Sequence, residues 1–72
     1  MRYVIIIEQG PTSYGAYVPD LPGCVAVGAT ADEVRTLIHE AILLHLESLQ
    51  ADGLALPPPR SQSDYIEIPL AA

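Results

Sequence analysis

Several residue types are absent from this chain of 72 residues or rare in it. It contains no Phe, no Trp and no Lys, and its one cysteine is Cys24. Without Phe and Trp, the core has to be built from Val, Ile, Leu and Ala, with Tyr at its margins. A single cysteine cannot form an internal disulfide, which agrees with a reducing compartment. A domain of this size buries only about 60% of its unfolded surface, so we expect self-association.

Positive charge is scarce. Three Arg stand against nine acidic residues, which gives a net charge of −6. Such a chain repels phosphate backbones, so we expect no direct nucleic-acid binding by this chain alone, whereas its acidity favours encounter with a basic protein. The longest apolar run, Val4 to Ile7, is far shorter than the roughly 20 residues of a membrane helix, and no charged leader precedes an apolar segment. We therefore expect a soluble, cytoplasmic protein with no membrane partner.

Three strands are predicted before a single helix. They are Arg2–Glu8, Tyr14–Val18 and Cys24–Val27, which are rich in β-branched or aromatic residues. Pro19 and Pro22 each remove a backbone donor, so neither neighbouring strand can continue through them, and the chain must reverse. This order predicts a meander of antiparallel strands.

The helix is predicted over residues 31–51. Thr30 and Glu33 have the spacing of a capping box at its start, and Gly53 is a natural stop. One broad apolar stripe follows the helical period: Val34, Leu37, Ile38, Ala41, Ile42, His45 and Leu49. Because one helix covers one face of a sheet and the first strand is apolar on both faces, the second face needs another copy of the chain.

The end of the chain reads as a separate segment. Pro57–Pro59 is a stiff extended spacer, and Tyr65–Ile68 alternates in β fashion, which predicts a fourth strand at a sheet edge. This strand can add to a neighbour's sheet. The sequence thus predicts an α+β domain over 1–56 and a proline-rich spacer with an edge strand over 57–72. The predicted fold is a small antiparallel β-β-β-α-β arrangement with the helix packed on one face.

A contact surface is predicted on the exposed side of the helix and in the last strand. Leu43 lies opposite the apolar stripe, so it lacks a reason within the chain to be apolar. The full set of candidate partner or oligomer contacts is His39, Glu40, Leu43, Leu46, Glu47, Ile66 and Ile68.

The titratable residues do not predict an enzyme. Glu8 and Asp20 end adjacent strands and invite a metal or acid/base interpretation, but carboxylates at strand ends are more often solvated loop residues. His39 and His45 lie about 240° apart around the helix, so they cannot share one metal ion. Cys24 has no cationic neighbour and is interpreted as a small apolar filler. We expect no catalytic residue, no metal and no cofactor.

Three motifs resemble the HicB family of bacterial and archaeal antitoxins over roughly residues 2–60. They are the string from Tyr17 to Cys24, the spacing of Gly28, Thr30 and Glu33, and the sequence His45-Leu46-Glu47, with Gly53 and prolines after them. The resemblance implies a partial RNase H-like fold without nuclease carboxylates. It also implies that the chain is the antitoxin of a type II pair, which binds and masks HicA, a small basic mRNA interferase.

The resemblance has one departure and leaves alternatives open. Many HicB proteins have a C-terminal DNA-binding module, whereas only residues 60–72 follow the prolines here, so we do not expect this chain to bind a promoter. One alternative is an oligomeric HicB-like binding or scaffold domain without a toxin partner. Another is a residual metal-dependent nuclease, in which Asp20 would be required for cleavage.

Overall fold

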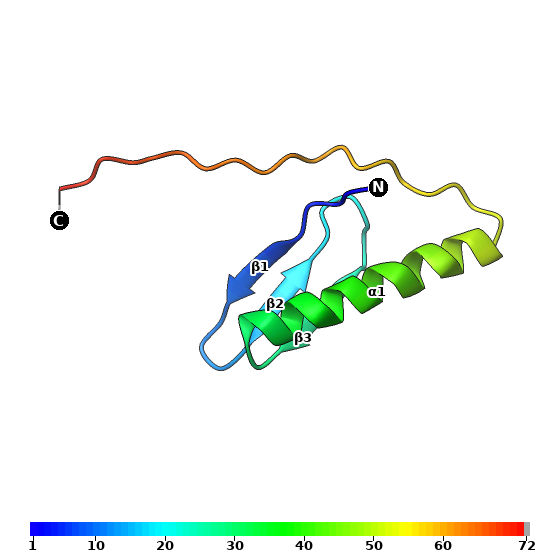
Figure 1. Cartoon of the computed structure of the whole chain (residues 1–72), viewed down its shortest axis with the longest axis horizontal. Coiled ribbons are helices and arrows are strands. Elements are labelled where there is room, and N and C mark those ends of the chain that lie inside the picture. Colours follow the sequence, from blue (N-terminus) through cyan, green and yellow to red (C-terminus); the bar gives the residue numbers. More distant parts are fainter. Residues whose placement is uncertain (72) are drawn as a thin grey trace.

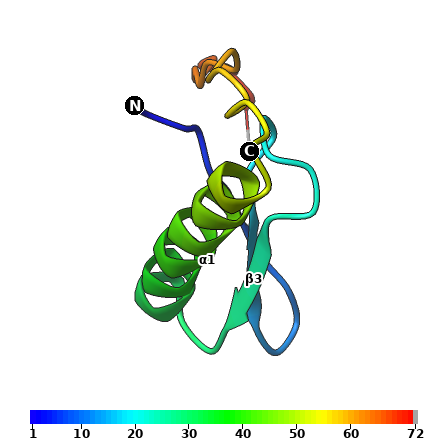
Figure 2. The same cartoon turned by 90° about the vertical axis from the view of Figure 1, so that its right-hand side faces the viewer.

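Three antiparallel strands and one helix make up the fold. The computed structural model describes residues 1–71. Strands β1 (Ile6–Gln9), β2 (Tyr14–Tyr17) and β3 (Val25–Gly28) form a sheet in the order β1-β2-β3, and α1 (Ala31–Ala51) follows them. The helix lies along one face of the sheet (Figure 1), and the turned view in Figure 2 shows α1 to one side of β3. The predicted α+β class is confirmed, whereas the likeness to RNase H stays a prediction.

Strand β1 begins later than predicted. Its first residue, Ile6, pairs with Tyr17 at the end of β2. In the same register residues 2–5 would have to pair with residues 18–21, which include Pro19 and the turn after β2, and proline has no backbone donor for a ladder. The predicted start at Arg2 is therefore wrong by four positions, because the partner strand ends first.

The connection from β2 to β3 is a tight turn fixed by its prolines and one glycine. The backbone N–H of Leu21 donates to Val18 O at 3.1 Å, and that of Cys24 donates to Leu21 O at 3.1 Å. Gly23 has a φ of 83°, a left-handed conformation that L side chains rarely adopt. The predicted reversal is confirmed, and it brings β3 beside β2.

Both ends of α1 are capped as predicted. The Thr30 side chain accepts a hydrogen bond from Glu33 N at 3.0 Å, and Glu33 Oε1 accepts one from Ala29 N at 3.2 Å. Gly53 ends the helix with a φ of 70°, and its N–H donates to Gln50 O at 3.0 Å. The predicted bounds, 31–51, are confirmed.

The core lies between α1 and the sheet and is aliphatic. Tyr3 and Tyr14 pack at its margin, as the composition predicts. Its buried members are Ala16, Val18, Leu21, Cys24, Val34 and Ile38. No helix within residues 1–71 combines the length and hydrophobicity needed to cross a membrane.

The segment after α1, residues 54–71, is called the tail. It runs from the end of α1 back past the N-terminus and beyond the rest of the fold (Figure 1), so the molecule measures 53 × 27 × 16 Å. The predicted fourth strand is wrong for the single chain, because Tyr65–Ile68 lies outside the three-stranded sheet and no strand within residues 1–71 pairs with it. Its alternating pattern favours an extended backbone, but a strand also needs a partner. The predicted segment 57–72 ends at Ala72, which lies outside the described residues.

Candidate functional site

One side of α1 presents leucines and carboxylates to solvent. His39, Leu43 and Glu47 follow one another at four-residue spacing, so they lie along one side of the helix. Glu40 and Leu44 lie beside them. The side chains of Leu43 and Leu44 are 51% and 66% exposed. We call these five residues the helix surface, and its charged groups are acidic.

The predicted contact residues fall into two separate groups. Glu40, Leu43 and Glu47 are exposed on α1 as predicted, and His39 is exposed beside a groove that reaches Ile5, the residue before β1. Leu46 is only partly accessible, because it packs against the core. Ile66 and Ile68 lie in the tail, which Figures 1 and 2 both show away from α1. The single chain therefore does not bring the two groups together.

The sheet face that points away from α1 is also largely apolar, with Glu8 as its charged residue. Ile6 pairs with Tyr17, and Tyr17 pairs with Val25, so these three side chains share that face. Val25 and Val27 are 63% and 67% exposed, which is a large exposure for valine in a strand. We call Ile6, Tyr17, Val25 and Val27 the sheet surface. Sequence reasoning predicted that this face needs cover but did not name Tyr17, Val25 or Val27, although their two-residue alternation was the available signal.

Asp20 holds the tail against the turn between β2 and β3. Its carboxylate accepts hydrogen bonds from Arg60 N, Ser61 N and Ser61 Oγ, each at 2.8 Å. The backbone and hydroxyl donors of Ser61 lower the pKa of Asp20 more than its partial burial raises it. Nearby, the hydroxyl of Tyr3 donates to Pro57 O. Sequence reasoning gave Asp20 a role in its turn and missed this contact across 40 residues.

The residues considered for chemistry do not converge. The described part of the chain contains no group of three or more His, Cys, Asp or Glu side chains that could hold a metal ion. Glu8 lies at the exposed end of β1, while Asp20 is occupied by the tail. His39 is exposed and His45 is partly buried. Cys24 is buried, and this burial raises the pKa of its thiol.

The fold and these surfaces define a small α+β domain with exposed apolar patches on its helix and its sheet. Residues 3–70 match the family described as "HicB_like antitoxin of bacterial toxin-antitoxin system". The chain belongs to this family, which confirms the resemblance seen in the sequence.

Individual relatives agree with this assignment. An uncharacterised 14.9 kDa protein of Haemophilus phage HP1 is 38% identical over 69 residues, which are 96% of this chain and 52% of the relative. A UPF0150 protein of Helicobacter pylori is 46% identical over 50 residues, 69% of each chain. Antitoxin HicB 2 of Photorhabdus laumondii is 24% identical over 96% of this chain and 50% of its own length. The chain thus spans about half the length of the phage and Photorhabdus relatives.

A solved structure has the same fold. A chain of the structure titled "HicA3 and HicB3 toxin-antitoxin complex" superimposes with a TM-score of 0.69 and 33% identity. The match covers 82% of this chain and 70% of the other. The fold therefore occurs in a chain that was solved within a toxin-antitoxin complex.

Proposed function

We propose that this chain is the antitoxin of a type II toxin-antitoxin pair. In this role it binds a small basic HicA-like mRNA interferase and masks the surface with which that toxin binds RNA. The family match and the likeness to a chain from a HicA3–HicB3 complex support this role. Inhibition by masking needs no reaction, so the chain acts as a binding protein and not as an enzyme.

The helix surface is the single observation that favours a basic protein as the partner. Leu43 and Leu44 offer apolar area near its centre, and Glu40 and Glu47 flank them. Apolar residues surrounded by charge resemble the centre and rim of a protein interface. The acidic rim would attract a basic toxin over long range, in keeping with the net charge of −6. His39 at one end of this surface and Leu46 at its border remain predicted contacts.

Substitution of Leu43 tests this interface. Leu43→Glu places a charge in the proposed centre, and the loss of one strong contact of about 2 kcal/mol corresponds to a roughly 30-fold weaker complex. Leu54→Glu is the matched control, because Leu54 is similarly exposed, at 57%, but lies after the helix. Affinity for the co-expressed toxin would be measured by calorimetry, with the unfolding temperature of both variants as a check on folding. Equal affinity of the two variants would contradict the proposed surface.

The proposed role is tested by inhibition of the toxin itself. We expect excess antitoxin to stop mRNA cleavage and added salt to slow complex formation, because salt screens the long-range attraction. A toxin that stays fully active in excess of this chain would rule out the antitoxin role.

The sheet surface favours a second candidate function. Its four apolar residues share their face with a single charged residue of the strands, Glu8, so this face suits a second copy of the chain better than a basic toxin. We infer that the chain forms a homodimer or larger oligomer in the cytoplasm and binds no nucleic acid alone. In the second candidate, this oligomer is a binding or scaffold domain that has no toxin. The inhibition assay distinguishes the two functions.

A further inference from the structure

The outer edge of β1 is open to another strand. In the sheet order β1-β2-β3, one side of β1 pairs with β2, and no strand among residues 1–71 lies on its other side. The outward backbone groups of β1 therefore lack ladder partners in the described chain. An open edge of this kind pairs readily with an added extended segment.

A groove whose lining is half apolar lies beside the start of this edge, on the helix side of the sheet. It has a volume of about 310 Å³ and is lined by Ile5, Ile38 and Ile42, with Arg35, Thr36 and His39. The groove exists because α1 packs mainly over β3 and β2 and covers β1 less. Ile7 of β1 is consequently still 38% exposed.

The tail contains a segment suited to this edge. Tyr65, Ile66 and Ile68 are 95%, 82% and 62% exposed, so their apolar surface is unused in the single chain. Side chains alternate along an extended backbone, so Ile66 and Ile68 share one side with Asp64. Tyr65 and Glu67 occupy the other side.

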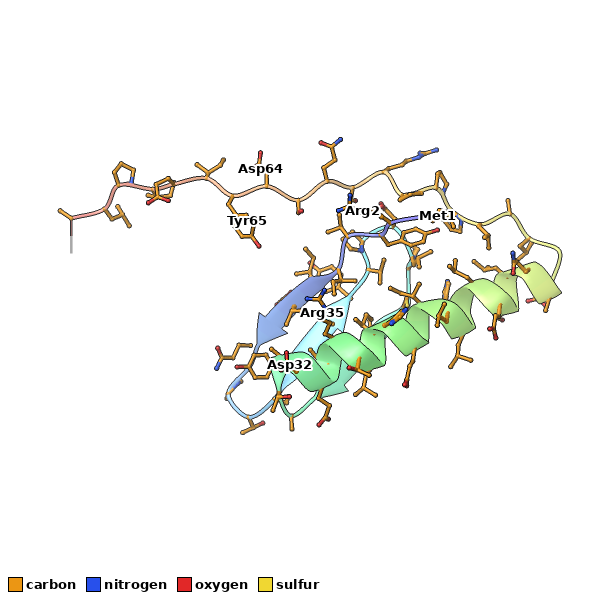
Figure 3. All side chains as sticks on the ribbon, viewed as in Figure 1. Met1, Arg2, Asp32, Arg35, Asp64 and Tyr65 are labelled. Atoms are coloured by element: carbon orange, nitrogen blue, oxygen red, sulfur yellow. The ribbon has the colours of Figure 1, made fainter. Side chains whose placement is uncertain are left out.

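The charges of the edge and the tail are complementary. Arg2 and Arg35 both line a second groove, of about 720 Å³, between the start of the chain and the tail. Figure 3 shows these two arginines below the tail, with the side chain of Tyr65 pointing down from the tail toward β1 and that of Asp64 pointing away. Arg35 is on α1 and also lines the first groove, on the helix side of the sheet. Arg2 precedes β1 at an even-numbered position, like Ile6 of the sheet surface.

We infer from these features that two copies of this chain exchange tails. Residues 65–68 of each copy add as a strand to the β1 edge of the other copy. Ile66 and Ile68 enter the first groove on its isoleucine side, where Asp64 reaches Arg35. Glu67 lies on the opposite face, next to Arg2. This arrangement gives the predicted fourth strand the partner that it lacks in the single chain, and it goes beyond the proposed function because no toxin takes part.

The tail passes its own sheet without pairing with it, which favours a second copy as the partner. Ser61–Ser63 and Tyr65 line a groove with Arg2–Ile5 of the same chain, but no strand within residues 1–71 pairs with the outer edge of β1. Asp20 fixes Arg60 and Ser61, and the segment after them extends past the rest of the fold (Figure 1). Residues 65–68 lie four to seven positions after Ser61, which is roughly 13–23 Å of extended chain, so they can reach the β1 edge of a molecule packed alongside. A two-fold exchange covers both open edges at once and leaves a closed dimer.

The test uses the chain alone, so that its result does not depend on the toxin. Light scattering after size-exclusion chromatography at about 100 µM should give the mass of a dimer. The double variant Ile66→Asp/Ile68→Asp should raise the dimer dissociation constant at least about tenfold. Leu70→Asp is the control, because Leu70 is 83% exposed in the same tail but lies beyond Pro69, and it should change the constant by less than about threefold. All of these side chains are exposed, so the variants should fold, which circular dichroism would verify.

A charge exchange and amide protection identify the interface. Arg2→Glu should weaken the dimer, and adding Glu67→Arg in the same chain should restore it. Hydrogen exchange of residues 4–9 should slow as the protein concentration rises, because the edge is covered only in the dimer. A monomeric wild-type chain, a dimer unaffected by the double tail variant, or edge protection independent of concentration would each overturn the exchange. The last result would mean that the tail folds back on its own sheet.

Discussion

Gly28 should be required for the close packing of α1 on β3, and this prediction can be made quantitative. A Cβ added at Gly28 would lie 2.9 Å from the backbone N of Val34 and 3.1 Å from its Cα. Both are backbone atoms in the first turns of α1. They cannot move aside, whereas the end of a flexible side chain could. Gly28 has no positive φ, so the contact and not the conformation explains this glycine.

The expected cost of Gly28→Ala follows from two opposing effects. Overpacking of this kind costs about 1–3 kcal/mol, because the helix must shift away from the sheet. The alanine also restricts the unfolded chain, which offsets about 0.4–1 kcal/mol. With the middle of each range, the net loss of unfolding free energy is about 1.3 kcal/mol, which corresponds to a fall in melting temperature of roughly 5–10 °C for a domain of this size.

Gly15→Ala is the matched control for this prediction. Gly15 also lies in the sheet, but a Cβ added there would be 4.0 Å from its nearest neighbour, the carbonyl oxygen of Ala26. Without a clash only the restriction of the unfolded chain remains, so the melting temperature should stay constant or rise. Thermal unfolding of the two variants by circular dichroism would test the difference. If Gly28→Ala melted within about 2 °C of the wild type, or if Gly15→Ala lost as much, the argument from close contact would be refuted.

Three further predictions follow from single contacts. The Ser61 donors lower the pKa of Asp20 below its ordinary value of 3.8. Attachment of the tail should therefore be complete above pH 3.8 and be lost as the pH falls through the lowered pKa of Asp20 in the folded chain. The amide resonance of Ser61 in a pH titration would report this acid transition. In the Asp20→Asn variant the transition should disappear. Thr30→Ala removes the bond to Glu33 N and should cost about 1 kcal/mol in chemical denaturation, whereas Thr30→Ser should retain most of it. Cys24 is buried with a raised pKa, so a thiol reagent at neutral pH should modify it only at the rate of unfolding.

The helix and the turn could be predicted because their signals are local. Thr30 and Glu33 cap the helix through atoms only three residues apart, and Gly53 ends it by its own backbone conformation. The reversal after β2 likewise depends on prolines within the turn and on Gly23. Local signals of this kind do not need the rest of the fold, so one sequence was enough to place them.

The tail and its anchor could not be predicted because their partners are distant. Asp20 has the spacing of an ordinary turn residue, and nothing near it in the sequence indicates that Ser61 will donate to it. Residues 65–68 have the alternating side chains of a strand. This pattern does not indicate with which sheet edge, or with which copy of the chain, the segment will form hydrogen bonds. The extent of β1 depended in the same way on where β2 ends.

The proposed contacts for a toxin and for a second copy lie on different parts of the molecule. The helix surface is centred on Leu43 and Leu44, whereas the exchange uses the β1 edge, its groove and the tail. Only His39 borders both, because it belongs to the helix surface and also lines the groove. A dimer formed by tail exchange would therefore leave both copies of the helix surface open, and two toxins could bind one antitoxin dimer. The stoichiometry of the complex thus depends on the β1 edge, while its affinity depends on α1, so either proposal can fail without the other.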